Sequence, residues 1–104
     1  MILAEIGDER VSQHEKWGEQ NWPQGTDRFT EFPDGPMSPI EVANFYRDIT
    51  ERNFRNGTLT FKDIQLEEVF EAEAETDTER LRKELIQSCA VAVARIETID
   101  RGGH

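Results

Sequence analysis

Apolar residues recur with helical spacing over most of this chain, interrupted by one long polar stretch. Four segments show the spacing: residues 2–20, 39–56, 60–75 and 78–100. In the last segment the stripe runs from Leu81 through Leu85 to Ile99, positions that fall on one side of a helix. The sequence has no strand alternation of useful length and no internal repeat. The pattern predicts an all-α fold, a small bundle of about four helices in one domain, residues 1–104.

Local start and stop signals set the expected helix boundaries. Ser38 before Pro39 is a good helix start, because serine caps a helix and proline suits its first position. The glycine of Asn56-Gly57 ends that helix, and Thr60 offers a cap for the next one. After the last helix, the tail of residues 102–104 is expected to be disordered.

Residues 21–37 interrupt the helical pattern. This stretch holds three of the four prolines and two glycines, together with several Asp, Thr and Asn residues, a composition typical of a loop. It is long for a structureless connection in so small a domain. We therefore expect the loop to be functional or partly ordered.

The net charge of the chain limits the kinds of molecule that it is expected to bind. Twelve basic residues against twenty-two acidic residues give a net charge of −10. So acidic a surface repels phosphate backbones, and nucleic-acid binding is not expected. An acidic protein that handles phosphates needs metal ions as intermediaries.

The chain is expected to be soluble and cytoplasmic. No segment reaches the roughly 20 apolar residues that a membrane span requires, and the N-terminus carries acids where a secretion signal carries bases. The single cysteine, Cys89, forms no internal disulfide, which agrees with a reducing compartment. Its apolar surroundings predict a buried structural thiol.

The candidate chemistry lies in two acidic clusters. The side chains concerned are Glu67, Glu68, Glu71, Glu84 and Gln87. A spacing of three places side chains about one helical turn apart on one face. Two adjacent helices with such pairs would gather several carboxylates around divalent cations, and Mg²⁺ prefers oxygen ligands of this kind.

These glutamates border apolar residues on their helices, where an unpaired carboxylate is costly. Clustered carboxylates without a cation also repel one another. The alternative is that they are solvated and paired with Arg80, Arg82 or Lys83. Their position beside apolar residues favours the metal.

The two clusters resemble a known family. Glu67-Glu68-Val69-Phe70-Glu71, a gap of twelve residues and Glu84-Leu85-Ile86-Gln87 are similar to the EExxE…ExxD signature of the MazG-like, all-α nucleoside triphosphate pyrophosphohydrolases. The segment EKWGEQNWPQG also resembles the Trp-containing segment of many members. The resemblance spans most of the chain, but it leaves out the long loop and the second helix.

The resemblance implies a helical bundle assembled as a homodimer or homotetramer, which cleaves a nucleoside triphosphate between the α and β phosphates with Mg²⁺ (or Mn²⁺). It implies that Glu68, Glu71 and Glu84 are metal ligands. Glu67 would be a ligand or the group that orients the attacking water. Gln87 stands where the family usually has aspartate. Its amide oxygen can still coordinate but carries no charge, so metal affinity or activity is expected to differ.

The substrate-binding candidates follow the same resemblance. Trp17 would stack on the base, although packing against a neighbouring helix explains it as well. Gln20 and Asn21 would hydrogen-bond a base edge, or they only end the first helix. Lys16 and Lys83 are candidates for phosphate contacts.

Two functions remain open from the sequence. The first is a Mg²⁺-dependent nucleoside triphosphate pyrophosphohydrolase in nucleotide-pool control, which releases a monophosphate and pyrophosphate. The alternative is a non-catalytic helical protein that keeps the family architecture and binds a partner or regulates. Gln87 and the long loop favour this alternative.

Overall fold

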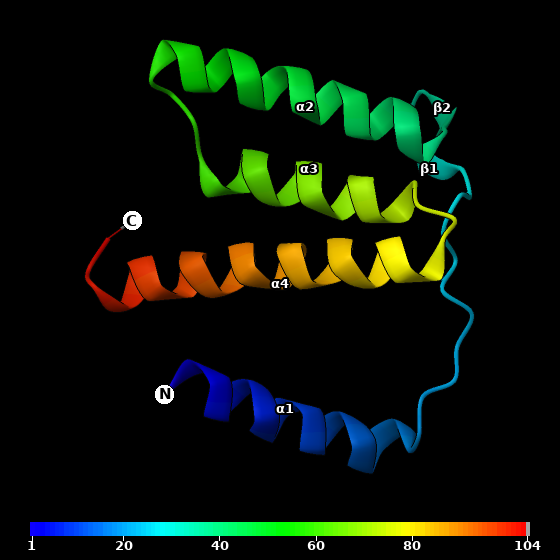
Figure 1. The fold of residues 1–104 in the computed structure, drawn as a ribbon, viewed down its shortest axis with the longest axis vertical. Coiled ribbons are helices and arrows are strands. Elements are labelled where there is room, and N and C mark those ends of the chain that lie inside the picture. Colours follow the sequence, from blue (N-terminus) through cyan, green and yellow to red (C-terminus); the bar gives the residue numbers. More distant parts are fainter. Residues whose placement is uncertain (104) are drawn as a thin grey trace.

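The computed structural model describes residues 1–103 and contains four α-helices and one β-hairpin (Figure 1). The helices are α1 (Ile2–Trp17), α2 (Pro39–Asn56), α3 (Phe61–Glu73) and α4 (Thr78–Asp100). The strands are β1 (Thr30–Phe32) and β2 (Gly35–Met37). The predicted all-α bundle of about four helices is confirmed. At the C-terminal end, the backbone N–H groups of Gly102 and Gly103 donate to the carbonyl oxygens of Ile99 and Thr98, at 2.9 and 2.8 Å. His104, the last residue of the expected tail, lies outside the described residues.

The helix boundaries follow the local signals, but α1 and α3 end earlier than expected, α3 at Glu73 rather than near Glu75. α1 ends at Trp17 rather than at Gln20, because Gly18 takes a positive φ of 71° and its N–H donates to the carbonyl of His14 at 2.7 Å. Gly57 ends α2 in the left-handed conformation, with φ 71° and ψ 22°. Glycine reaches such φ values at little steric cost.

The predicted caps are present. The Ser38 hydroxyl accepts the Glu41 backbone N–H at 3.4 Å at the start of α2. At the start of α3, Thr60 accepts the N–H of Asp63 at 3.3 Å, and the Asp63 carboxylate accepts the N–H of Thr60 at 3.2 Å. This reciprocal pair satisfies two N–H groups that the helix itself leaves free. α3 therefore starts at a fixed residue, and this sets which way its glutamates face.

The long loop is partly ordered, as expected, and it contains two three-residue strands that the sequence pattern did not predict. β1 and β2 pair antiparallel, with Thr30 opposite Met37 and Phe32 opposite Gly35. Three-residue strands are too short for an alternation to be recognised in the sequence. The loop is also fastened to α3, because the Asp27 N–H donates to the Glu73 carbonyl at 2.7 Å.

The helices lie side by side in the order α2, α3, α4, α1 (Figure 1), with direct packing of α2 on α3 and of α3 on α4. Few side chains are enclosed by this arrangement. In residues 1–103 the buried hydrophobic residues are Val42, Ala43, Ala72 and Leu81. The radius of gyration is 15.7 Å, against about 13 Å for a compact domain of this length. The chain alone is therefore an open layer rather than a closed bundle.

Much apolar surface is left uncovered. α1 contributes no buried residue, and three positions of the predicted core stripe of α4, Leu85, Ile96 and Ile99, are exposed. Cys89 is exposed too, so the expectation of a buried thiol was wrong. The sequence pattern identified an apolar face, and residues 1–103 bury Leu81 but leave Leu85, Ile96 and Ile99 of this face exposed. None of the four helices in the described part of the chain is long and apolar enough to cross a membrane.

Candidate functional site

Three glutamates converge between α3 and α4. Glu68 and Glu71 are one turn apart on α3, and Glu84 comes from the facing side of α4. Each offers one carboxylate oxygen, and these three oxygens all lie within 4.8 Å of one another. The convergence follows from the i, i+3 spacing within α3 and from the packing of α4 directly against α3. We call Glu68, Glu71 and Glu84 the glutamate group.

Two oxygens of the glutamate group are buried without a partner. The Oε2 atoms of Glu68 and Glu84 are shielded from solvent, and neither has a hydrogen-bond partner within residues 1–103. An ionised oxygen in such a position is unfavourable unless it is paired or bound to a cation. This observation fits a divalent cation, because it requires several oxygen donors at one place.

The pKa values agree with the crowding of the glutamate group. Burial raises the pKa of Glu68 above its ordinary value, and the negative charges of Glu71, Glu84 and Glu67 raise it further. Burial also raises the pKa of Glu84, as do the charges of Glu71 and Glu75, while Lys83 acts in the opposite direction. Without a cation, the site therefore resists full ionisation.

Glu67 lies between the glutamate group and Arg47 of α2. Its Oε1 lies 3.8 Å from Nε of Arg47, and its side chain is only 17% exposed. Burial raises the pKa of Glu67, the charge of Glu71 raises it further, and Arg47 lowers it only in part. Glu67 thus stands beside the glutamate group as a carboxylate with raised proton affinity.

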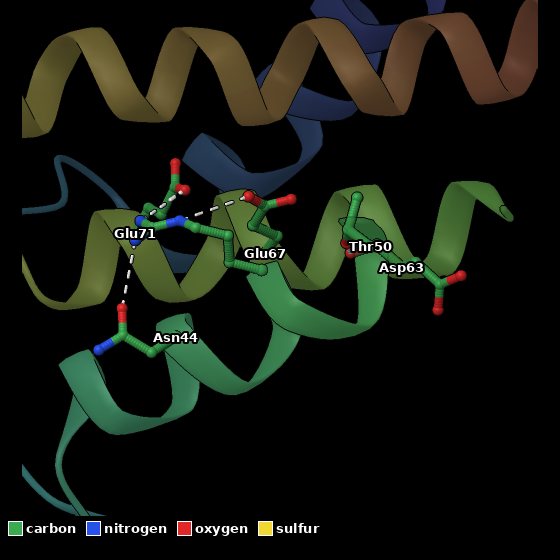
Figure 2. A network of polar contacts seen from close by, with 6 residues as sticks. Asn44, Thr50, Asp63, Glu67 and Glu71 are labelled. Atoms are coloured by element: carbon green, nitrogen blue, oxygen red, sulfur yellow. Dashed lines mark hydrogen bonds and ion pairs between the residues drawn. The ribbon is translucent and has the colours of Figure 1, made fainter. Parts of the chain in front are cut away.

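Sequence reasoning missed Arg47. Its Nη2 donates to Oε1 of Glu71 at 3.2 Å, and its Nη1 donates to Oδ1 of Asn44 at 3.2 Å (Figure 2). Arg47 lies seven positions after Ile40 and four after Ala43, so the three share one face of α2. The arginine on that face of α2 was the only sequence signal for this role. The sequence pattern could not identify its partner on α3, because that pairing depends on how α2 packs on α3.

The alternative to a metal site was that the glutamates are solvated and paired with Arg80, Arg82 or Lys83, and these expected ion-pair partners were wrong. In residues 1–103 the ion pairs join Arg47 to Glu67 and Glu71, and Arg101 to Glu97. Arg80, Arg82 and Lys83 are not among the cations of these pairs. The cation that pairs with Glu67 and Glu71 is instead Arg47 of α2.

A pocket of about 280 Å³ opens beside the glutamate group. Its charged lining residues are Arg47, Glu71, Glu75 and Glu84, and its other lining residues are Ile40, Ala43 and Ala74. α2, α3 and α4 all contribute. The pocket is therefore a place where a ligand can meet the carboxylates of Glu71 and Glu84.

The other predicted site residues lie elsewhere in the protomer. Lys16, Trp17 and Gln20 line a separate pocket of about 470 Å³ on α1, where Lys16 Nζ is 4.8 Å from the centre of the Trp17 ring. Asn21 is exposed in the loop that follows. Because α4 stands between α1 and α3 (Figure 1), the structure does not bring these residues to the glutamate group.

Two predicted residues of α4 are also set apart. Lys83 lines a pocket with Asp77, Glu79 and Arg80. Gln87, one turn after Glu84, is exposed. The metal ligands that the sequence predicted are thus gathered as three glutamates, with Gln87 at the periphery.

Comparisons of the chain with models of protein families, with curated proteins and with solved structures find no match. The resemblance in the glutamate motif stays a prediction.

Proposed function

We propose that the chain is a Mg²⁺-dependent nucleoside triphosphate pyrophosphohydrolase, which cleaves its substrate between the α and β phosphates and acts in nucleotide-pool control in the cytoplasm. The observation that carries the proposal is the glutamate group, whose three carboxylate oxygens lie within 4.8 Å of one another. The buried, unpartnered oxygens of Glu68 and Glu84 support it. Such a donor set suits Mg²⁺, and also Mn²⁺.

Glu68, Glu71 and Glu84 would hold the cation. When bound, a divalent cation neutralises the polyphosphate and lowers the pKa of the attacking water. It also supplies the positive charge that a chain with a net charge of −10 needs to attract a triphosphate.

Glu67 would orient the attacking water and accept its proton. Its raised pKa suits a general base, because a base works best when its pKa is close to the working pH. Its place next to the glutamate group on α3 puts it within one turn of Glu68 and Glu71.

The same proposal includes a homodimer or homotetramer. α1 has no buried residue, and α4 exposes Leu85 and Ile96. A second copy would cover this surface. Since α4 separates α1 from the glutamate group in one protomer, Trp17 would reach a bound base only from a second copy or after α1 moves.

The test is a panel of ribo- and deoxynucleoside triphosphates, incubated with and without Mg²⁺ and assayed for pyrophosphate and for the monophosphate. We expect equal amounts of both products from at least one nucleotide, and none without the cation. Release of orthophosphate and diphosphate instead would mean that another bond is cleaved and would contradict the proposal.

A non-catalytic binding or regulatory protein is the second candidate. The exposed side chain of Gln87, in place of the aspartate that the resemblance predicts, favours it. Calorimetry separates the two candidates. If every common nucleotide binds weakly or not at all in the presence of Mg²⁺, the second candidate is favoured.

A further inference from the structure

Arg47 brings a positive charge to the edge of the glutamate group. Its guanidinium contacts Glu71 at 3.2 Å and Glu67 at 3.8 Å on α3, and Asn44 at 3.2 Å on its own helix. Figure 2 shows Asn44, Glu67 and Glu71 gathered at this point between α2 and α3. Although it is held from several sides, the Arg47 side chain remains 45% exposed. A ligand can therefore reach it.

Glu71 belongs to two arrangements at once. It accepts a hydrogen bond from Arg47, and it is a member of the glutamate group that offers oxygens to a cation. A divalent cation in the glutamate group would attract the Glu71 carboxylate and repel the guanidinium, because like charges at close range disfavour each other. Arg47 and the cation thus compete for one carboxylate.

The pocket beside Glu71 needs a positive charge in order to take an anion. It measures about 280 Å³, close to the lower end of small-ligand pockets, about 300 Å³. Of the described residues that line it, Arg47 is the only basic one, among the carboxylates of Glu71, Glu75 and Glu84. A phosphate entering this pocket would be repelled by the three carboxylates and attracted only by the guanidinium and a bound cation.

We propose that Arg47 is a phosphate-binding residue of the site, which exchanges its contact with Glu71 for an oxygen of the metal-complexed polyphosphate. The inference rests on the proposed function, since it assumes a cation in the glutamate group. A guanidinium presents paired N–H donors that match two phosphate oxygens. Asn44, which accepts from Nη1, would keep the side chain oriented during the exchange.

A purely structural role explains Arg47 less well. Ion pairs as exposed as this one add little to the stability of a fold. The helix that carries Arg47 also lies outside the part of the chain that resembles the pyrophosphohydrolases. The assignment therefore comes from the contacts of α2 with α3 in this structure.

The two roles of Arg47 predict opposite changes in two binding constants. In Arg47→Gln, we expect Mn²⁺ alone to bind more tightly, by about threefold or more, because a competing cation is gone. Inorganic pyrophosphate at saturating Mg²⁺ should bind about tenfold or more weakly, because a charge-assisted contact is lost. Arg47→Lys keeps the charge without the fork and should fall between wild type and Arg47→Gln in both constants.

Isothermal titration calorimetry measures both constants on the full chain, and circular dichroism confirms that each variant is folded. Arg52→Gln, on an exposed position of the same helix, is the matched control and should behave as wild type. If wild type binds Mn²⁺ and pyrophosphate and Arg47→Gln gives the same constants, the inference fails while the proposed function stands. If Arg47→Gln binds Mn²⁺ more weakly, Arg47 supports the site structurally and the inference also fails. If wild type binds no cation, the proposed function fails and the inference with it.

Discussion

Glu68 on α3 and Glu84 on α4 each bury an unpartnered Oε2 atom, and they offer carboxylate oxygens within 4.8 Å of each other. Burial raises the pKa of both carboxyls, and a neighbouring negative charge from Glu71 adds to the effect in each case. Two half-buried carboxylates that approach each other, each with one shielded oxygen, weaken the fold unless a cation lies with them. The arrangement of the glutamate group therefore favours binding a ligand and does not stabilise the fold by itself.

The first prediction concerns catalysis. Glu68→Gln and Glu71→Gln should each abolish Mg²⁺-dependent pyrophosphate release, because an amide lacks the charge that holds the cation. The measurement is pyrophosphate production at saturating nucleotide. Glu79→Gln, on an exposed position of α4, is the control and should keep wild-type turnover. Unchanged turnover in both glutamate variants, with circular dichroism showing a normal fold, would reject the assignment.

The second prediction separates stability from metal binding. Without a divalent cation, Glu68→Gln should raise the free energy of unfolding by about 1 kcal/mol, the usual gain when an unfavourable group is replaced. Urea denaturation measures this change.

Adding Mg²⁺ should make wild type more stable to unfolding than Glu68→Gln. At a Mg²⁺ concentration ten times its Kd, wild type should gain about 1.4 kcal/mol by mass action, and Glu68→Gln should gain much less. Glu79→Gln should follow wild type under both conditions. A variant that is less stable than wild type without Mg²⁺ would show that Glu68 has a stabilising partner.

The glutamate group was predictable from sequence because it needs little tertiary information. The spacing of Glu68 and Glu71 fixes their common face once the helix is known. The short connection to α4 makes the two helices neighbours, so Glu84 can be placed near them. Arg47 is different, because its role depends on the way α2 packs on α3, and helical spacing within one segment carries no information on that contact.

Two other features of the structure, the hairpin and the exposed stripe of α4, differ from what the sequence predicted, and each difference has its own physical cause. The hairpin strands are too short to show alternation, but the turn residues Pro33-Asp34-Gly35 between Phe32 and Met37 were a usable signal. The exposed stripe of α4 has another cause. Periodicity shows that a helix face is apolar, but it does not show whether the same chain or a second copy covers that face.

The third prediction concerns pH. The folded-state pKa values of Glu67, Glu68 and Glu84 are raised above their ordinary value of 4.5. At these three glutamates the folded chain therefore binds more protons than the unfolded chain when the pH is above 4.5. Their contribution is fully present below the unfolded pKa and is lost as pH rises through the folded pKa. The lowered pKa of Asp63, caused first by its hydrogen bond with Asn53, acts the other way and removes stability as pH falls.

Urea midpoints measured without divalent cations should therefore decrease as pH rises above 4.5 and through the raised folded-state pKa values. Glu68→Gln should flatten this decrease, whereas Glu79→Gln should not. Mg²⁺ affinity should increase over the same range, because protons compete with the cation for the raised carboxyls. A wild-type midpoint that rises steadily over this range would contradict the third prediction.

The fourth prediction concerns assembly. α1 buries no residue, and a lone helix of 16 residues is marginal in water without a partner surface. On α4, Leu85, Cys89 and Ile96 lie on one side of the helix, and all three are exposed. We expect this surface to be covered by a second copy, so the mass in solution should be a multiple of the 12.0 kDa chain.

Ile96→Glu should dissociate the assembly, because it places a charge on the apolar stripe of α4 about three turns away from Glu84. Size-exclusion chromatography with light scattering measures the mass. Phe54→Glu is the matched control, since Phe54 is 72% exposed near the end of α2, away from α1 and α4. Loss of helicity together with loss of mass in Ile96→Glu alone would show that the second copy also holds α1 in its helical form. A wild-type chain that runs as a monomer at all concentrations would mean that the apolar stripe serves another partner, and Trp17 could then reach a bound base only if α1 moved.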